Sequence, residues 1–162
     1  KYLFETFKSK GFEYLGIDIN DLDFTNDKMQ FEDNTFDFVI CLAVIEHIKD
    51  PSLFLTEVFR VLKSKGIFYL TTPNWHYSAD TFFDDPTHEK PYTPESLQYL
   101  LNSFEFKNIK TFPGLRKKPK WFYSGKYRFF KGRYLFPFKN EKNLIPNFLK
   151  GKSSSIICVS QK

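Results

Sequence analysis

Short apolar runs, separated by polar stretches, recur along the chain and predict buried strands at residues 12–19, 36–44, 66–72, 104–112 and 154–160. The run FDFVICLAV at 36–44 is continuously apolar rather than alternating. Such a run is typical of a parallel sheet that is covered on both faces. We therefore expect this strand to be buried on both sides.

Amphipathic segments lie between these runs. Residues 1–10 carry apolar side chains at helical spacing. The pairs Asp50-Pro51 and Thr93-Pro94 each combine a capping side chain with a proline suited to a first helical turn, so each predicts the start of a helix.

Strands that alternate with helices predict an α/β fold, here a Rossmann-like, doubly wound and mostly parallel sheet in a single domain over 1–162. Between the runs at 104–112 and 154–160 the sequence has no helix pattern that would serve as a parallel crossover. We therefore expect these two strands to add an antiparallel edge strand to the sheet.

Charge divides the chain. Residues 1–106 contain 9 Lys/Arg and 18 Asp/Glu, whereas residues 107–162 contain 15 Lys/Arg and one acid. The acidic part would suit a cofactor with hydroxyl and amino groups, and the basic part an anionic acceptor or a membrane surface. Mutual attraction of the two parts is the alternative.

Cys41 and Cys158 both lie within apolar runs, without the spacing of a metal or redox motif. We expect buried thiols in a reducing compartment. The chain has no apolar stretch of about 20 residues and does not start like a secretory signal. These features predict a cytoplasmic protein.

The segment GIDIN at 16–20 ends a predicted strand on Asp18. An acidic residue at this place in a doubly wound sheet accepts hydrogen bonds from ribose hydroxyls. A strand-ending aspartate is equally common as a helix cap, so this segment alone leaves both roles open.

Residues 31–74 provide a more specific signal, because several short motifs occur there in a fixed order: FEDNTFD, an apolar strand, IEH, DPSLF, RVLKSKG and TTPN. This stretch resembles the unit from the fourth to the fifth strand of class I S-adenosylmethionine-dependent methyltransferases. The resemblance covers roughly residues 12–105. It implies a methyltransferase that uses S-adenosylmethionine as its cofactor.

The resemblance also implies cofactor contacts residue by residue. Asp18 would bind the ribose hydroxyls. Asp23 would accept from the adenine amino group, with Phe24 beside the ring. The backbone around Cys41 and Leu42 would line the methionine side.

Two features of the sequence depart from the family pattern. The link between Asp18 and Phe31 is short, so Asp27 competes with Asp23 for the adenine contact. In addition, no GxGxG motif occurs in the 162 residues, and the family's first strand would precede residues 1–10. We therefore expect the fold to be N-terminally incomplete.

The loop 75–92 contains DPTH and leads into YTPESL. It resembles a subgroup of these methyltransferases, several of which act on surface polysaccharides or lipid-linked sugars. An oxygen of a glycan or another small molecule is therefore the expected acceptor. His88 is our candidate general base, because imidazole exchanges its proton near neutral pH. Alternatively, Thr87 and His88 only tie the loop to the next helix.

Glu46, His47 and His88 also form a carboxylate and imidazole set of the kind that binds metal ions. The VIEH and TTPN segments resemble those of small-RNA 2′-O-methyltransferases, which use metal ligands from such a pair. Ala43 stands where that family carries a further glutamate. We therefore expect no metal here, and expect Glu46 and His47 to orient the helix start beneath the cofactor.

In residues 113–152, lysines and arginines alternate with aromatic side chains. This basic aromatic segment could contact a membrane surface or a lipid-linked acceptor, or bind single-stranded nucleic acid, which we consider the weaker reading. Packing of the aromatic rings on the sheet is the structural alternative. If contact with membrane occurs, the protein would be peripheral to the inner membrane face.

The leading hypothesis from sequence is thus methyl transfer to an acceptor oxygen, in a pathway of surface polysaccharide synthesis. The alternatives are a methyltransferase-like binding module that has lost activity, and an RNA methyltransferase.

Overall fold

The computed structural model describes residues 2–17, 22–114, 116–117 and 152–162. Asp18 and most of the basic aromatic segment lie outside these described residues. The elements in chain order are α1 (Tyr2–Ser9), β1 (Phe36–Leu42), the 3-10 helix η1 (Ile45–His47), α2 (Ser52–Val61), β2 (Leu62–Pro73), α3 (Trp75–Ser78), the 3-10 helix η2 (Phe82–Asp84), α4 (Pro94–Ser103), β3 (Lys107–Pro113), β4 (Arg116–Lys117), β5 (Lys152–Ser153) and β6 (Ser155–Gln161).

The described strands form a four-stranded mixed sheet in the order β1-β2-β6-β3, together with a small β4-β5 pair. The strands β1 and β2 are parallel, whereas β6 is antiparallel to both of its neighbours. The antiparallel pairing of β3 with β6 is as predicted, but the antiparallel strand does not lie at the edge: β6 is inserted between β2 and β3. The apolar β6 suits an interior position, and β3, with Lys107 and Lys110, suits an edge.

The strand predicted at 12–19 is wrong for residues 12–17, which the structure describes as irregular backbone. Phe12 and Leu15 are more than half exposed. A strand is stabilised by pairing with a neighbour, and residues 12–17 pair with no strand of the described sheet.

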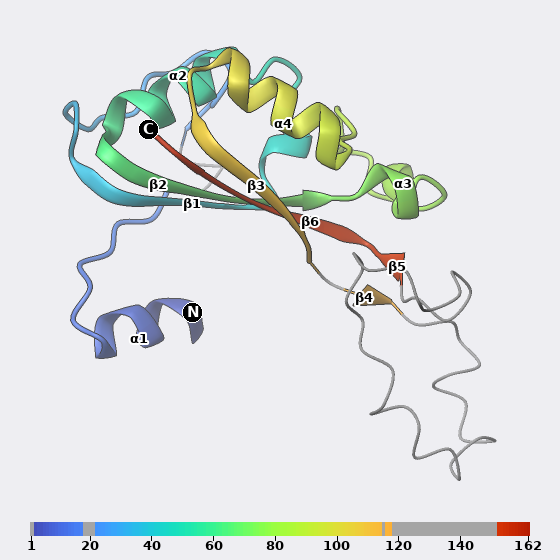
Figure 1. Ribbon diagram of the computed structural model, residues 1–162, viewed down its shortest axis with the longest axis horizontal. Coiled ribbons are helices and arrows are strands. Elements are labelled where there is room, and N and C mark those ends of the chain that lie inside the picture. The colour runs from blue at the N-terminus through green and yellow to red at the C-terminus, as the bar shows by residue number, and fades with distance from the viewer. Residues whose placement is uncertain (1, 18–21, 115, 118–151) are drawn as a thin grey trace, which may run out of the picture.

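The helix predicted from Thr93-Pro94 starts as expected, with Thr93 as its N-cap, whereas α2 starts one residue later than predicted, with Pro51 as its N-cap and no side-chain cap. Asp50 Oδ1 accepts from the backbone N–H of Ser52 at 3.0 Å, at the first turn of α2. Thr93 and Ser96 form a reciprocal capping box at the start of α4. Both helices lie over the same face of the sheet, and α1 lies on the opposite side (Figure 1). No helix among the described residues is long and apolar enough to span a membrane.

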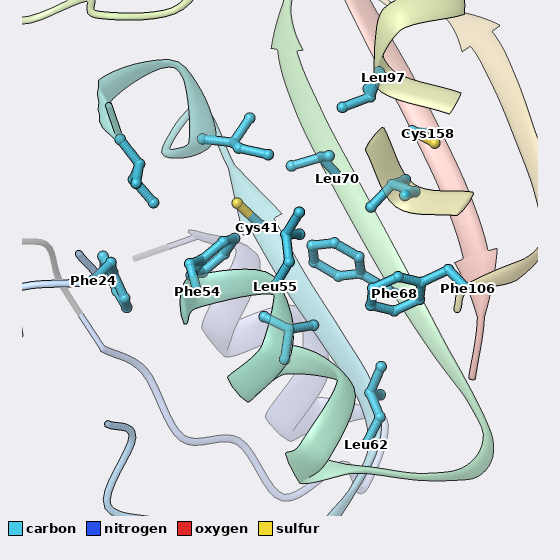
Figure 2. Close-up of a cluster of buried hydrophobic side chains, with 14 of the residues drawn as sticks. Phe24, Cys41, Phe54, Leu55, Leu62, Phe68, Leu70, Leu97, Phe106 and Cys158 are labelled. Atoms are coloured by element: carbon cyan, nitrogen blue, oxygen red, sulfur yellow. The ribbon is translucent and has the colours of Figure 1, made fainter. Parts of the chain in front are cut away.

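The hydrophobic core lies between the sheet and the helices α2 and α4 (Figure 2). On β2, Phe68 and Leu70 point into it and are fully buried. The expectation that residues 36–44 are buried on both faces is wrong. In β1, Cys41 lies in the core, whereas Phe38, Ile40 and Leu42 are between 41% and 58% exposed. The apolar run therefore contributes side chains to the hydrophobic core, but only from one face of β1.

Candidate functional site

The candidate site lies where the parallel strands β1 and β2 end. Leu42, the last residue of β1, is in register with Thr71, near the end of β2. In open α/β sheets, ligands bind at the carboxyl ends of such strands. Ala43 follows with a φ of 53°, and its N–H donates to Thr71 O at 3.0 Å. Non-glycine residues seldom adopt this conformation, and such residues are frequent at functional sites.

This sharp turn leads directly into η1, which brings the Glu46 carboxylate to Thr72 of β2. The Glu46 side chain is fully buried. Its Oε2 accepts from the hydroxyl of Thr72 at 3.0 Å, whereas Oε1 has no hydrogen-bond partner among the described residues. Burial raises the pKa of Glu46, and the hydrogen bond from Thr72 and the nearby imidazoles oppose this rise. A buried carboxyl oxygen without a partner is unusual, because its desolvation is not compensated.

The loop 75–92 is fixed against η1 by backbone hydrogen bonds. The N–H groups of Glu89 and Lys90 both donate to Glu46 O, at 2.8 and 3.0 Å. At the other side of the loop, Trp75 N donates to Tyr92 O at 2.9 Å. Because these contacts hold both ends of the loop, the segment around His88 lies next to Glu46.

His47 donates from its ring toward Thr87 of this loop. Its Nδ1 lies 3.1 Å from Thr87 O and 2.9 Å from Thr87 Oγ1. The hydroxyl of Thr87 already donates its hydrogen to Asp85 Oδ1 at 2.6 Å. Both oxygens of Thr87 can therefore only accept, so Nδ1 of His47 carries the hydrogen. In the neutral ring, the lone pair then resides on Nε2.

The same argument applies to His88. Its Nδ1 lies 2.6 Å from Phe82 O, and a carbonyl oxygen only accepts, so this nitrogen is also protonated. The ring packs against Phe82, and its centroid lies 4.7 Å from that of His47. The Nε2 atom of His88 lies 3.9 Å from Asp85 Oδ2. Two imidazoles in the same tautomer thus face one another beside a buried carboxylate.

Ligand atoms of Glu46, His47 and His88 lie within 4.8 Å of one another. The sequence indicated these three residues but not their supporting contacts. Thr72, Thr87 and Tyr92 were not identified as contributing to this site from the sequence. Tyr92 is buried with no hydrogen-bond partner for its hydroxyl among the described residues, and burial, followed by the charge of Glu46, raises its pKa. The TTPN and DPTH motifs contain the two threonines, so the motifs were the available signal.

Two of the predicted cofactor residues, Cys41 and Leu42, end β1 at this same place. Leu42 is 46% exposed, whereas Cys41 is buried. Burial, and to a lesser degree the charge of Glu46, raises the pKa of the Cys41 thiol to about 12. The Cys41 thiol is therefore neutral, and the exposed backbone and the Leu42 side chain are what this strand end can offer to a ligand.

The other predicted cofactor residues lie elsewhere. Asp23 is exposed, and its carboxylate accepts from Thr25 N at 2.9 Å and Asn26 Nδ2 at 2.8 Å. These bonds lower its pKa and hold a turn. Phe24 is buried against Phe54, with ring centroids 5.3 Å apart. Both residues thus have structural contacts of their own.

The described fold is of the α/β type, and solved methyltransferase structures share it. A crystal structure of an S-adenosylmethionine-dependent methyltransferase from Archaeoglobus fulgidus superposes on 99% of this chain and 80% of its own, with a TM-score of 0.67 and 20% identity. A structure from Thermotoga maritima, described as a methyltransferase and possible histamine N-methyltransferase, covers 83% of this chain and 60% of its own, with a TM-score of 0.57 and 18% identity. At these identities the similarity concerns the fold.

The sequence comparisons give matches to methyltransferases. Residues 4–70 match the model of a methyltransferase domain. A probable S-adenosylmethionine-dependent methyltransferase from Mycolicibacterium smegmatis is 33% identical over 82 residues, which are 49% of this chain and 32% of the relative. Over residues 4–70 the chain thus matches a methyltransferase domain, and over 82 residues it is similar to a probable S-adenosylmethionine-dependent methyltransferase.

An uncharacterized protein of Methanocaldococcus jannaschii is 41% identical over 46 residues, which are 28% of this chain and 20% of that protein. The chain thus matches about a third or less of the length of these curated relatives.

Proposed function

We propose that the protein transfers a methyl group from S-adenosylmethionine to an oxygen of a sugar or lipid-linked glycan, in the synthesis of a surface polysaccharide. The observation that carries this proposal is the position of His88. The loop 75–92 is tied to η1 through Glu46 O, which brings His88 to the carboxyl ends of β1 and β2. The resemblance of this loop to that of glycan-modifying methyltransferases supports the choice of acceptor.

The residues at the end of β1 fit the cofactor on its methionine side. Leu42 is exposed, and the positive φ of Ala43 turns the backbone at the strand end. The two residues predicted to contact adenine have other partners in the structure. The carboxylate of Asp23 is bonded within its turn, and the ring of Phe24 is covered by Phe54. When bound, S-adenosylmethionine supplies a methyl group on a positively charged sulfur.

In this proposal the protein orients the acceptor and takes up its proton. The lone pair of His88 Nε2 accepts the hydroxyl proton, and Phe82 O holds the ring in the required tautomer. The carboxylate of Asp85, 3.9 Å from Nε2, stabilises the resulting imidazolium. Most of the rate enhancement would come from alignment of the two reactants rather than from the base.

The experiment is methyl transfer from radiolabelled S-adenosylmethionine to polysaccharide and lipid-linked glycan acceptors, with calorimetric binding of S-adenosylhomocysteine in parallel. Labelled glycan supports the proposal. Cofactor binding without transfer to any glycan contradicts the acceptor, and transfer to RNA instead would identify an RNA methyltransferase. Binding of a glycan without any affinity for the cofactor would indicate a binding module that has lost activity.

The second part of the proposal concerns the basic aromatic segment, residues 113–152, and its contact with a membrane surface. Its 12 Lys/Arg in 40 residues favour contact with an anionic membrane surface, which would bring the enzyme to a lipid-linked acceptor. This contact rests on the sequence, because most of the segment lies outside the described residues.

A further inference from the structure

We propose that Glu46, His47 and His88 bind one divalent metal ion of the type that prefers imidazole and carboxylate ligands, such as Zn²⁺. The sequence led us to expect no metal, because Ala43 offers no ligand. The geometry of the remaining three residues outweighs that argument: one ligand atom from each lies within 4.8 Å of the others. Metal–ligand bonds of about 2.0–2.2 Å would bring such atoms to about 3–4 Å apart, which modest side-chain rotation achieves.

Each of the two histidines is held as a metal ligand would be. Histidines that bind metals usually donate their other ring N–H to a carbonyl or carboxylate, which fixes the tautomer. His47 Nδ1 donates to Thr87 in this way, and His88 Nδ1 donates to Phe82 O. Both rings therefore keep an unprotonated Nε2 for an ion.

The contacts of Glu46 are those of a metal-binding carboxylate. Thr72 orients the carboxylate through Oε2, while Oε1 is buried and has no hydrogen-bond partner among the described residues. An isolated buried carboxylate is costly, and an ion beside Oε1 would compensate this cost. The full burial of Glu46 distinguishes the cluster from ordinary surface acids, which rarely bind ions.

Three protein ligands would leave positions of the ion open, as in catalytic rather than structural sites. An acceptor hydroxyl could bind there and release its proton to water more readily, because a bound cation lowers the pKa of a coordinated hydroxyl group. His88 would then act as a ligand instead of as the base. This consequence rests on the proposed methyl transfer, whereas the ion site itself does not.

The test is calorimetric titration of the chelator-treated protein with ZnCl2 and CoCl2, without cofactor or acceptor. Failure of methyl transfer therefore leaves this result intact. We expect one ion per chain and a visible Co²⁺ absorption spectrum. His47→Gln and His88→Gln should each weaken binding about 100-fold, and Thr87→Val about tenfold through the orientation of His47.

The matched control is His76→Gln, because His76 is the chain's remaining histidine and is exposed on α3. It should leave affinity unchanged. Equal losses of ion affinity in all three histidine variants would mean adventitious binding and overturn the proposal. A wild-type affinity no tighter than that of a His47→Gln, His88→Gln double variant would overturn it as well.

The Glu46→Gln variant distinguishes a metal ion bound at Oε1 from a proton carried by Oε1. If Oε1 merely carries a proton, the neutral amide should leave ion affinity unchanged, which contradicts the site; the proposal expects a clear loss. Circular dichroism checks the fold of every variant. Should one histidine variant unfold, the other histidine variant and Thr87→Val decide together, because Thr87 is exposed and its loss need not disturb the core.

Discussion

Arg60 Nη1 donates to Asp33 Oδ1 at 2.7 Å, which joins two motifs that lie 27 residues apart in sequence. The same guanidinium binds both carboxylate oxygens of Glu57, at 2.7 and 2.8 Å, and donates to the carbonyls of Met29 and Phe31. The hydrogen bonds to the carboxylates of Glu57 and Asp33 raise the pKa of Arg60 above its ordinary value. The arginine of the RVLK motif therefore fixes the loop before β1 onto α2.

Replacement of Arg60 by alanine should destabilise the fold by about 2–4 kcal/mol, because the Glu57 side chain, only 4% exposed, would lose its charged partner and keep only the N–H of Met29. Lys63→Ala is the matched control, since its bond to Asp37 joins two exposed side chains and should contribute about 0–1 kcal/mol. Urea unfolding of both variants measures the difference. Equal effects would contradict the buried role of the Arg60–Glu57 pair.

His88→Ala should lower turnover and leave the affinity for S-adenosylhomocysteine nearly unchanged, since His88 acts on the acceptor. Initial rates and calorimetry on the same preparation make the comparison. His76→Ala should leave both quantities near wild type. If turnover survives in His88→Ala, the residue only ties the loop to η1. Loss of activity on chelation, restored by Zn²⁺, would indicate that His88 acts through an ion.

Asp18→Ala should weaken S-adenosylhomocysteine binding by about 1–3 kcal/mol, the usual cost of leaving charged hydrogen bonds unmade. This prediction comes from the sequence, because Asp18 lies outside the described residues. Asp23→Asn is the informative comparison, because the carboxylate of Asp23 already accepts hydrogen bonds from Thr25 and Asn26 of its own turn. Unchanged affinity in Asp18→Ala would remove this residue from the cofactor site.

Neither cysteine of the native protein should react with a thiol reagent at pH 8. Burial raises the pKa of both Cys41 and Cys158 to about 12, so only about one thiol in 10⁴ is ionised at that pH. Both should react after unfolding in urea. The raised values favour the folded state below the ordinary thiol pKa, so this contribution to stability is lost as pH rises from about 9 toward 12. Rapid labelling of the native chain would contradict the burial.

The basic aromatic segment should bind liposomes that contain anionic lipid, and high salt should release the protein only partly. Its cations would each contribute about 1 kcal/mol, which salt screens, whereas insertion of aromatic rings is insensitive to salt. Replacement of Arg116, Lys117, Lys118 and Lys120 by glutamine should reduce binding without loss of folding, as co-sedimentation and circular dichroism can measure. If the protein instead binds single-stranded nucleic acid, with a log affinity that falls linearly with log salt concentration, nucleic acid is the favoured partner.

Local chemistry in the sequence determined the helix starts and most of the strands. Thr93 caps α4, and Asp50 binds the first N–H of α2, because these side chains reach N–H groups only two or three residues away. The apolar runs that became β1, β2 and β6 needed no knowledge of their partners, since burial of at least one face follows from composition. The motif order within 31–74 likewise indicated the methyltransferase family.

The tertiary structure decided what depends on partners distant in sequence. The run at 12–19 is as apolar as a strand, yet residues 12–17 are irregular and pair with no strand of the described sheet. The interior place of β6 depends on pairing with both β2 and β3. His47 and Thr87 are 40 residues apart, and their hydrogen bond sets a tautomer that no local pattern specifies. A sequence states which groups are available, whereas distances between remote groups arise only when the chain packs.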